Sequence, residues 1–216
     1  MKLVALSVGG PREVEWQGET VRTSIFKDRV TDRRRVSGFN IAGDEQSDLS
    51  VHGGRYKAVY VYPSEHYPLW RRELGEPDIA FGGFGENLTT EGLTEDDVCV
   101  GDRFRIGTAE FAVTQPRQPC FKLGIRRHRL DMVRLFHKSG RSGFYFSIER
   151  EGDVQEGDAI EVVARDEQKV SVATLFRLMY ADNPDIGLLK IAAAHPALAP
   201  SWREDFSDRL ERTIRG

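Results

Sequence analysis

Cysteine is scarce in this chain of 216 residues, which contains only Cys99 and Cys120. Two cysteines exclude a disulfide framework, and they cannot supply the four ligands of an ordinary iron–sulfur cluster. No apolar run approaches the length of a membrane span, and the run at residues 1–10 is too short for a signal peptide and predicts a first strand. These absences predict a cytoplasmic protein, in a reducing compartment, without membrane contact.

An excess of positive charge is also missing, since the formal net charge is −3. This argues against binding to a nucleic acid polymer, which usually requires a basic surface. The glycine-rich run at residues 81–85 lacks the fingerprint, the helix and the acidic residue of a dinucleotide site. With 39% hydrophobic and 30% charged residues, the composition is that of an ordinary globular protein that can bury a sizeable core.

Strand patterns dominate the first three quarters of the chain. Residues 58–62 are apolar or aromatic throughout, and residues 104–114 alternate around a glycine, which predicts two paired strands. A Gly-Asp turn precedes a strand at Gly101 and again at Gly157, which favours a barrel-like sheet. Residues 67–74 predict one short helix with a proline in its first turn. We therefore expect a mainly β fold, a β-barrel with a few short helices.

Helical patterns replace these strands near residue 165. Apolar residues recur at helical spacing after Ser171, which would cap the first of three helices. A second helical run covers residues 186–194, and a capping box at residues 201–204 would open the third helix. The chain should thus divide into a sheet domain, residues 1–164, and a three-helix unit, residues 165–216. The three-helix unit is marginal alone and should dock on the sheet or on a second copy of the chain.

The segment at residues 115–123 carries the strongest candidate for chemistry. Two prolines stiffen the backbone ahead of Cys120, and Arg117 and Lys122 flank it with positive charge that favours the thiolate. A thiolate is both a nucleophile and a metal ligand. The alternative is a thiol buried as a small hydrophobe. For Cys99, which lies between two valines, we expect that second environment, within the core.

Several segments taken in order resemble one known family. They are residues 43–46, 51–58, 84–89, 100–102 and 115–123. Together they resemble the MOSC family, the molybdenum cofactor sulfurase C-terminal domain. Residues 62–67 followed by Trp70, together with the helical tail, are similar to its bacterial YiiM-like branch, over nearly the whole chain.

The resemblance implies a β-barrel of the kind found in the small domain of pyruvate kinase, binding a molybdenum-pterin cofactor. It implies that Cys120 is the molybdenum ligand and the catalytic residue of an enzyme, an oxidoreductase that reduces N-hydroxylated small molecules such as hydroxylamino purines. Because reduction consumes two electrons and the chain has no site to draw them from, we expect a separate electron-donating reductase as partner. The helical unit would build a homodimer interface.

The physical chemistry of the same segments agrees with this implication. Glycine pairs let backbone N–H groups approach a phosphate, an arginine grips phosphate with two hydrogen bonds, and a lysine serves as a point charge. An asparagine can donate to and accept from a pterin edge. The expected cofactor-binding residues are His52, Gly53, Gly54, Lys57, Gly85, Asn87, Arg117 and Lys122.

Some of these residues have structural alternatives. His52 would then merely brace a turn, and Asn87 would adopt left-handed turn geometry. Glu86 would anchor a neighbouring loop by accepting backbone N–H groups rather than act in catalysis, and His66 would pack among aromatic rings. The basic residues after Lys122 would lie on the solvated face of a helix whose apolar side includes residues 130, 133 and 136.

Two other functions stay open at this point. The domain would be a carrier of the cofactor or of sulfur, using a Cys120 persulfide, without turnover of its own. A Cys–His hydrolase would need a histidine placed against Cys120, and no pattern in the sequence selects one.

Overall fold

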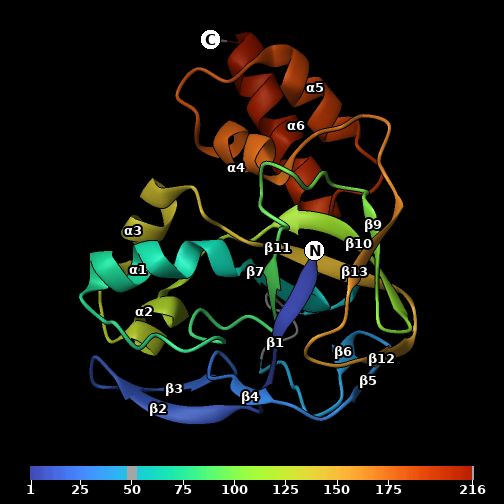
Figure 1. Ribbon diagram of the computed structural model, residues 1–216. Coiled ribbons are helices and arrows are strands. Elements are labelled where there is room, and N and C mark those ends of the chain that lie inside the picture. Colours follow the sequence, from blue (N-terminus) through green and yellow to red (C-terminus); the bar gives the residue numbers. More distant parts are fainter. Residues whose placement is uncertain (48–52, 216) are drawn as a thin grey trace.

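A computed structural model describes residues 1–47 and 53–215 of the chain. Its largest element is an eight-stranded sheet with the order β13-β9-β10-β11-β7-β8-β1-β4 (Figure 1). The strands of this sheet are β1 (Lys2–Val8), β4 (Asp28–Val30), β7 (Val59–Pro63), β8 (Leu88–Glu91), β9 (Arg103–Ile106), β10 (Ala109–Pro116), β11 (Phe144–Arg150) and β13 (Ile160–Ala164). All neighbouring pairs are antiparallel except β7 and β8.

Backbone hydrogen bonds close this sheet into a barrel. The N–H of Leu3 in β1 donates to the carbonyl of Asp158 at 3.0 Å, and the N–H of Gly157 donates to the carbonyl of Leu3 at 2.8 Å. The segment that leads into β13, at one end of the strand order, is therefore joined to β1, the strand next to the other end. Closure removes the open edges that a sheet of this size would otherwise present. The expectation of a mainly β, barrel-like fold is confirmed.

Smaller elements surround the barrel. The remaining strands are β2 (Arg12–Trp16), β3 (Glu19–Thr23), β5 (Arg34–Ser37), β6 (Asn40–Ile41) and β12 (Gly152–Val154). The short helices of this part are η1 (Arg55–Lys57), η2 (Ser64–His66), α1 (Tyr67–Leu74), α2 (Phe121–Arg127) and α3 (Met132–Ser139). Figure 1 shows α1, α2 and α3 along one side of the barrel and the β2–β3 hairpin at its base.

The two Gly-Asp turns adopt the same geometry. Gly101 and Gly157 have φ angles of +91° and +95°, in the left-handed region that favours glycine. The carboxylates of Asp102 and Asp158 each accept a hydrogen bond from the backbone N–H three residues earlier, at 3.0 and 2.8 Å. The strands that follow, β9 and β13, pair with each other. The similarity in sequence thus marks two equivalent corners of the barrel.

Three helices, α4 (Val172–Tyr180), α5 (Ile186–Ala194) and α6 (Pro200–Arg215), form the C-terminal unit. The hydroxyl of Ser171 accepts a hydrogen bond from the N–H of Thr174 at 3.1 Å, which confirms the predicted cap. The prediction that a capping box at residue 201 opens the last helix is wrong. The helix begins at Pro200, whose fixed φ suits a first helical position, so Ser201 lies inside the first turn.

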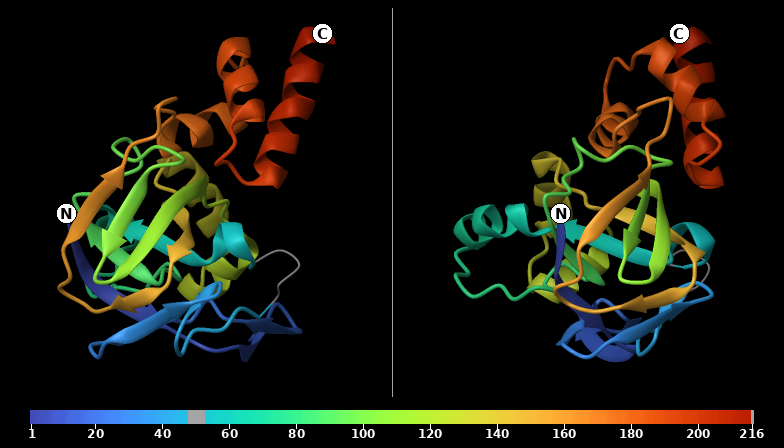
Figure 2. Two further views of the ribbon diagram at one scale, coloured as in Figure 1. Left: turned by 90° about the vertical axis from the view of Figure 1, so that its right-hand side faces the viewer. Right: turned by 45° about the vertical axis from the view of Figure 1, so that its right-hand side comes forward.

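The helical unit packs on one end of the barrel, opposite the β2–β3 hairpin (Figure 2). The N–H of Ala199 donates to the carbonyl of Thr114 in β10 at 3.4 Å, and buried residues of α4 such as Leu175 belong to the same hydrophobic cluster as Val113. The expected docking on the sheet is confirmed. The division at residues 164 and 165 and the homodimer stay predictions.

A second cluster of buried side chains lies between the barrel and helices α1 to α3. The rings of Trp70 and Phe136 stack with centroids 5.6 Å apart, and Tyr62 and Phe84 pack against them. His66 contacts the Tyr62 ring and is 9% exposed, so the expected packing among aromatic rings is confirmed. This cluster includes Leu123 of α2, the helix whose N-cap is Cys120.

Three expectations about buried and solvated residues are wrong. Leu130 precedes α3 and is 71% exposed, because the chain breaks into two helices where one was expected. Arg127 is only 9% exposed and pairs with Glu76 instead of facing solvent. Cys99 is half-buried, because the chain turns there so that its N–H reaches the carboxylate of Asp102. Among the described residues, no helix combines the length and the apolar character needed to cross a membrane.

Candidate functional site

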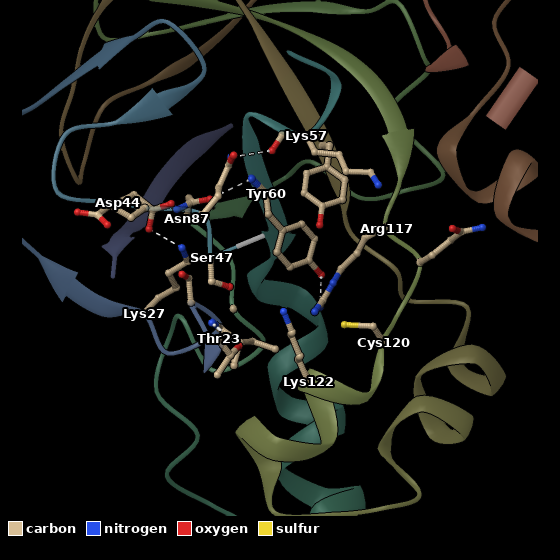
Figure 3. Close-up of a pocket in the computed structure, with 17 residues that line it drawn as sticks. Thr23, Lys27, Asp44, Ser47, Lys57, Tyr60, Asn87, Arg117, Cys120 and Lys122 are labelled. Carbon is tan, nitrogen blue, oxygen red and sulfur yellow. Dashed lines mark hydrogen bonds and ion pairs between the residues drawn. The ribbon is translucent and has the colours of Figure 1, made fainter. Parts of the chain in front are cut away.

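A pocket opens beside the start of α2, and six of the predicted site residues line it. They are Lys57, Gly85, Asn87, Arg117, Cys120 and Lys122. The described lining comes from segments far apart in sequence: residues 23–27, 44–47, 57–60, 85–87 and 117–122, together with Tyr145. Figure 3 shows how these side chains face a common space. The structure therefore brings most of the predicted residues together, while their roles stay predictions.

Cys120 has a fixed position at the entrance to α2. It is the N-cap residue, with extended backbone angles, and its carbonyl accepts the N–H of Leu123 at 2.9 Å. Its side chain is half-buried and belongs to the pocket lining. In Figure 3 the sulfur points toward the charged ends of Arg117 and Lys122. The alternative of a thiol sealed in the apolar core is therefore wrong.

Arg117 is a buried cation at the base of the pocket. It is 5% exposed, and its Nη1 donates to the carbonyl of Phe84 at 2.9 Å and to the Tyr60 hydroxyl at 3.2 Å. Burial lowers the pKa of the guanidinium, but Tyr60, Tyr145 and the Cys120 thiol raise it by more, so its pKa lies above its ordinary value. Within the described ranges, no carboxylate forms an ion pair with it. A buried charge without a counter-ion is costly, so this pocket is suited to an anion.

Two lysines of the pocket, Lys27 and Lys57, have different electrostatic surroundings. Lys27 forms a buried ion pair with Asp44, whose carboxylate also accepts the N–H of Gly9 at 2.9 Å. These bonds give Asp44 a structural role beside the pocket. Burial lowers the pKa of Lys57, and the nearby Cys120 thiol opposes that change. Lys57 is thus coupled electrostatically to the candidate cysteine.

Gly85 and Asn87 line the same pocket as Arg117. Gly85 has a φ of +84°, and a Cβ there would lie 2.7 Å from a side-chain carbon of Ile25, so only glycine fits. The Asn87 side chain accepts the N–H of Tyr60 at 3.1 Å and donates to the carbonyl of Ser7 at 3.3 Å. It therefore joins β1 to β7. Its contact with a pterin edge stays a prediction.

Glu86, between these two residues, is fully buried and turned away from the pocket into a hydrogen-bond network. Its carboxylate accepts the N–H groups of Gly82 at 2.8 Å and Phe84 at 3.1 Å, and the hydroxyls of Thr89 at 2.9 Å and of Tyr67. Burial raises the pKa of this carboxyl, and the hydrogen bonds oppose the rise. The prediction that Glu86 anchors a neighbouring loop is confirmed.

The remaining predicted residues precede η1. His52 lies outside the described residues. Gly54 has a φ of +82° and accepts the N–H of Lys57 through its carbonyl at 3.1 Å, so it shapes the turn that brings Lys57 to the pocket. Neither Gly53 nor Gly54 is among the described lining residues. Their contact with a phosphate stays a prediction.

Sequence reasoning missed several residues of the pocket. Tyr60 was expected only as a strand residue and Tyr145 was not singled out, although the phenols of both interact with Arg117. Lys27 and Ser24 come from a segment without any motif, and only the fold brings them to the pocket. Lys27 lies in the connection between β3 and β4 and gives only a weak signal in the sequence, because lysine is rarely buried unless paired.

The helical unit also reaches the cysteine segment. Burial raises the pKa of Tyr180, at the end of α4, and the nearby side chain of Gln118 opposes this rise. Gln118 lies two residues before Cys120 and lines the same pocket. A residue of the C-terminal unit is thus close to the pocket rim.

Three features of the pocket fit a cofactor that combines a metal with an anionic organic ligand. Arg117 supplies a buried positive charge, and the buried hydroxyl of Ser24 has no hydrogen-bond partner within the described chain. A thiolate such as that of Cys120 is a soft ligand for a polarizable metal. The described residues contain no cluster of three histidine, cysteine or acidic side chains. Cys120 is therefore the candidate metal ligand among the described residues of the pocket.

Comparison with known families identifies the class to which this barrel and pocket belong. The MOSC domain model matches residues 48–161, and the model of the YiiM-like 3-alpha helix domain matches residues 170–213. The chain belongs to the MOSC family and carries the C-terminal domain of its YiiM-like members. The family is associated in general with the molybdenum cofactor.

Individual relatives agree with this assignment. Protein YflK of Bacillus subtilis (strain 168) is 39% identical over 98% of this chain and 96% of its own length. Protein YiiM of Escherichia coli (strain K12) is 35% identical over 87% of this chain and 90% of its own. A protein of Gibberella moniliformis named "Reductase" is 34% identical over 80% of this chain, which spans only 31% of that longer protein.

Solved structures show the same fold. The crystal structure of YiiM from Geobacillus stearothermophilus superposes with a TM-score of 0.81 at 36% identity, covering 97% of this chain and 98% of the other. That of YiiM from Escherichia coli gives a TM-score of 0.78 at 27% identity, covering 98% and 94%. The barrel and the helical unit described above are therefore those of the YiiM structures.

Proposed function

We propose that this protein binds a molybdenum-pterin cofactor in the Cys120 pocket and reduces N-hydroxylated small molecules. The observation that carries the proposal is the meeting, in one pocket, of a half-buried thiol and a buried guanidinium that forms no ion pair within the described residues. The first suits a soft metal, and the second suits the phosphate of the cofactor. Membership of the MOSC family and a relative named a reductase support the same conclusion.

Each group of residues has a distinct role in this proposal. Cys120 would hold the metal at a distance fixed by the N-cap geometry of α2. Arg117 would form two parallel hydrogen bonds to the phosphate, and Lys57 and Lys122 would add positive charge. Asn87 would orient the pterin edge. When bound, the molybdenum centre would supply the two-electron chemistry that the side chains lack.

The overall reaction balances as a two-electron reduction. The substrate N–OH bond breaks, two electrons and two protons are consumed, and the products are the N–H compound and water. The sequence contains no dinucleotide fingerprint, so a separate reductase must supply the electrons. The fungal relative is about three times as long as the part that this chain matches, which leaves room for an additional module in that protein.

Metal analysis of the purified protein tests the proposal. Protein expressed in cells supplied with molybdate should contain molybdenum near one atom per chain, together with a pterin detected by its fluorescence after oxidation. The Cys120→Ala variant should fold and lose the metal. Cys99→Ala is the matched control, because Cys99 lies outside the pocket and should not affect the metal content. Equal molybdenum in the Cys120→Ala variant would contradict the proposal.

Mass spectrometry of the intact chain separates the proposal from the carrier function. A sulfane sulfur on Cys120, added as a mass of one sulfur atom that reducing agent removes, would support a sulfur carrier instead. Loaded protein that reduces a hydroxylamino substrate only when an electron donor is present would support the reductase. Turnover with NADH alone would exclude the need for a separate partner.

A further inference from the structure

Glu95 is a buried carboxylate that lies outside the described lining of the Cys120 pocket. It is 4% exposed, and both of its carboxylate oxygens have partners. Oε1 accepts the backbone N–H of Gly143 at 2.6 Å, and Oε2 lies 2.7 Å from Nε2 of His66. The backbone carbonyl of Glu95 accepts the N–H of Ala173, in the first turn of α4, at 2.9 Å. A buried carboxylate is retained only where it is well hydrogen-bonded, so these partners show which segments Glu95 holds together.

The bond from Gly143 makes Glu95 the first member of a chain of hydrogen bonds that ends at Arg117. The N–H of Gly143 and the carbonyl of Ser142 belong to one planar peptide unit and point in opposite directions. That carbonyl accepts the hydroxyl of Tyr60 at 2.9 Å. The Tyr60 oxygen in turn accepts Nη1 of Arg117 at 3.2 Å (Figure 3). A rigid peptide and one phenol thus connect the carboxylate to the guanidinium.

The same turn also fixes the backbone of Arg117, whose N–H donates to the carbonyl of Gly143 at 3.3 Å. Gly143 has a φ of +62°, and a Cβ there would lie 2.4 Å from the carbonyl oxygen of Val61. Only glycine fits so close to β7, so no side chain at this position can anchor the turn. The Glu95 carboxylate supplies that anchor from outside the turn.

We propose that Glu95 is a positioning residue for the anion site. Through the peptide between Ser142 and Gly143 and the Tyr60 hydroxyl, its carboxylate holds the Arg117 guanidinium in the orientation that binds a phosphate. A donor that is held in place before binding loses little freedom when the anion arrives, so affinity depends on bonds remote from the ligand. The inference rests on that part of the proposed function in which Arg117 binds phosphate.

Calorimetric titration of the full-length protein with pyrophosphate tests this role. Glu95→Ala should weaken the affinity about tenfold, because the guanidinium is no longer held. Glu95→Gln keeps an oxygen for the N–H of Gly143 and should stay within about threefold of the natural protein. Glu95→Asp is one methylene too short to reach both Gly143 and His66, and it should lose about fivefold. This last variant carries the test if Glu95→Ala does not fold.

A double variant distinguishes positioning from a general effect on the fold. Tyr60→Phe breaks the chain between Glu95 and Arg117 while keeping the ring. In that background Glu95→Ala should lower the affinity by less than about twofold, because substitutions within one hydrogen-bond network are not additive. The matched control is Asp102→Ala, which removes another buried carboxylate that accepts backbone N–H groups but is not among the described residues lining the pocket. It should lower stability in urea and leave the affinity within about twofold.

The outcomes separate this inference from the proposed function. Unchanged pyrophosphate affinity in a folded Glu95→Ala or Glu95→Asp variant overturns the inference and leaves the proposed function standing. Additive losses in the double variant, or an equal loss in Asp102→Ala, overturn the inference as well. Natural protein that does not bind pyrophosphate at millimolar concentration overturns both. Affinity that depends on Arg117 and Glu95 in a protein that contains no molybdenum or pterin after expression with molybdate supports the inference and overturns the proposed function.

Discussion

Glu86 and Arg117 are both buried ionisable residues next to the same loop, yet their surroundings differ completely. Four donors converge on the Glu86 carboxylate, two from the backbone and two from hydroxyls. Arg117 makes two hydrogen bonds to neutral oxygens and has no carboxylate partner within the described chain. The first arrangement is complete without a ligand, whereas the second leaves a buried charge without a counter-ion among the described residues.

This difference separates structural from functional polar groups more clearly than burial does. A satisfied buried group stabilises the fold because each of its partners would otherwise be left without a hydrogen bond. A buried charge without a counter-ion contributes less to the fold than such a network, and it favours the binding of an anion. The comparison therefore predicts opposite effects of substitution on stability and on binding.

Replacing Glu86 should give the largest change in stability. Glu86→Ala leaves four buried donors unsatisfied and should lower the free energy of unfolding by about 3–5 kcal/mol. Urea denaturation followed by tryptophan fluorescence measures this loss. Glu91→Ala, at an exposed position of β8, should stay within about 0.5 kcal/mol of the natural protein. A loss below about 1 kcal/mol for Glu86→Ala would show that the network contributes little.

Replacing Arg117 should affect binding and leave stability almost unchanged. Arg117→Met removes a buried charge while keeping an apolar side chain, so the free energy of unfolding should fall by less than about 1 kcal/mol or should rise. Affinity for pyrophosphate should drop about 10- to 100-fold, as expected for lost charge-assisted hydrogen bonds. Calorimetric titration measures it. Arg35→Met, at an exposed site in β5, serves as control. A large loss of stability with unchanged affinity would reverse the comparison.

Lys57 is a partly buried cation of the same pocket, and the pH dependence of anion binding should show its contribution. Its pKa lies below the ordinary 10.5 because burial disfavours the charged form. The protonated side chain attracts an anion, so its contribution to pyrophosphate affinity is present below that lowered pKa and is lost as pH rises through it. Both proteins would carry Cys120→Ser, so that the thiol does not titrate. The pyrophosphate affinity of the protein with Lys57, divided by that of the Lys57→Met variant, should fall several-fold and approach one as the pH rises, before it reaches 10.5. A ratio that stays constant across this range would remove Lys57 from the anion site.

Local patterns in the sequence predicted the scaffold well. The alternation in residues 104–114 specified a hairpin, and Ser171 marked the start of α4, because turns and caps depend on residues close together in the chain. The segment around Cys120 identified the centre of the site for the same reason. Its two prolines and flanking charges are local features.

The pocket wall could not be predicted in the same way. Lys27 and Tyr145 are more than a hundred residues apart in sequence, and neither belongs to a motif. Their approach to Cys120 depends on barrel closure, which is a property of the whole sheet. Leu130 was wrongly expected on the apolar side of a helix. Three apolar residues within seven positions cannot show that the helix breaks between residues 127 and 132. The proximity of Tyr180 to Gln118 likewise depends on how the helical unit docks.

The hydrophobic cluster that runs from the barrel into α4, α5 and α6 makes the two units one cooperative structure. Thermal melting should therefore show a single transition for the entire chain, because neither part can lose its order without uncovering the interior of the other. A shortened chain that ends near residue 164 would expose apolar residues at the end of β10 and would be prone to aggregate.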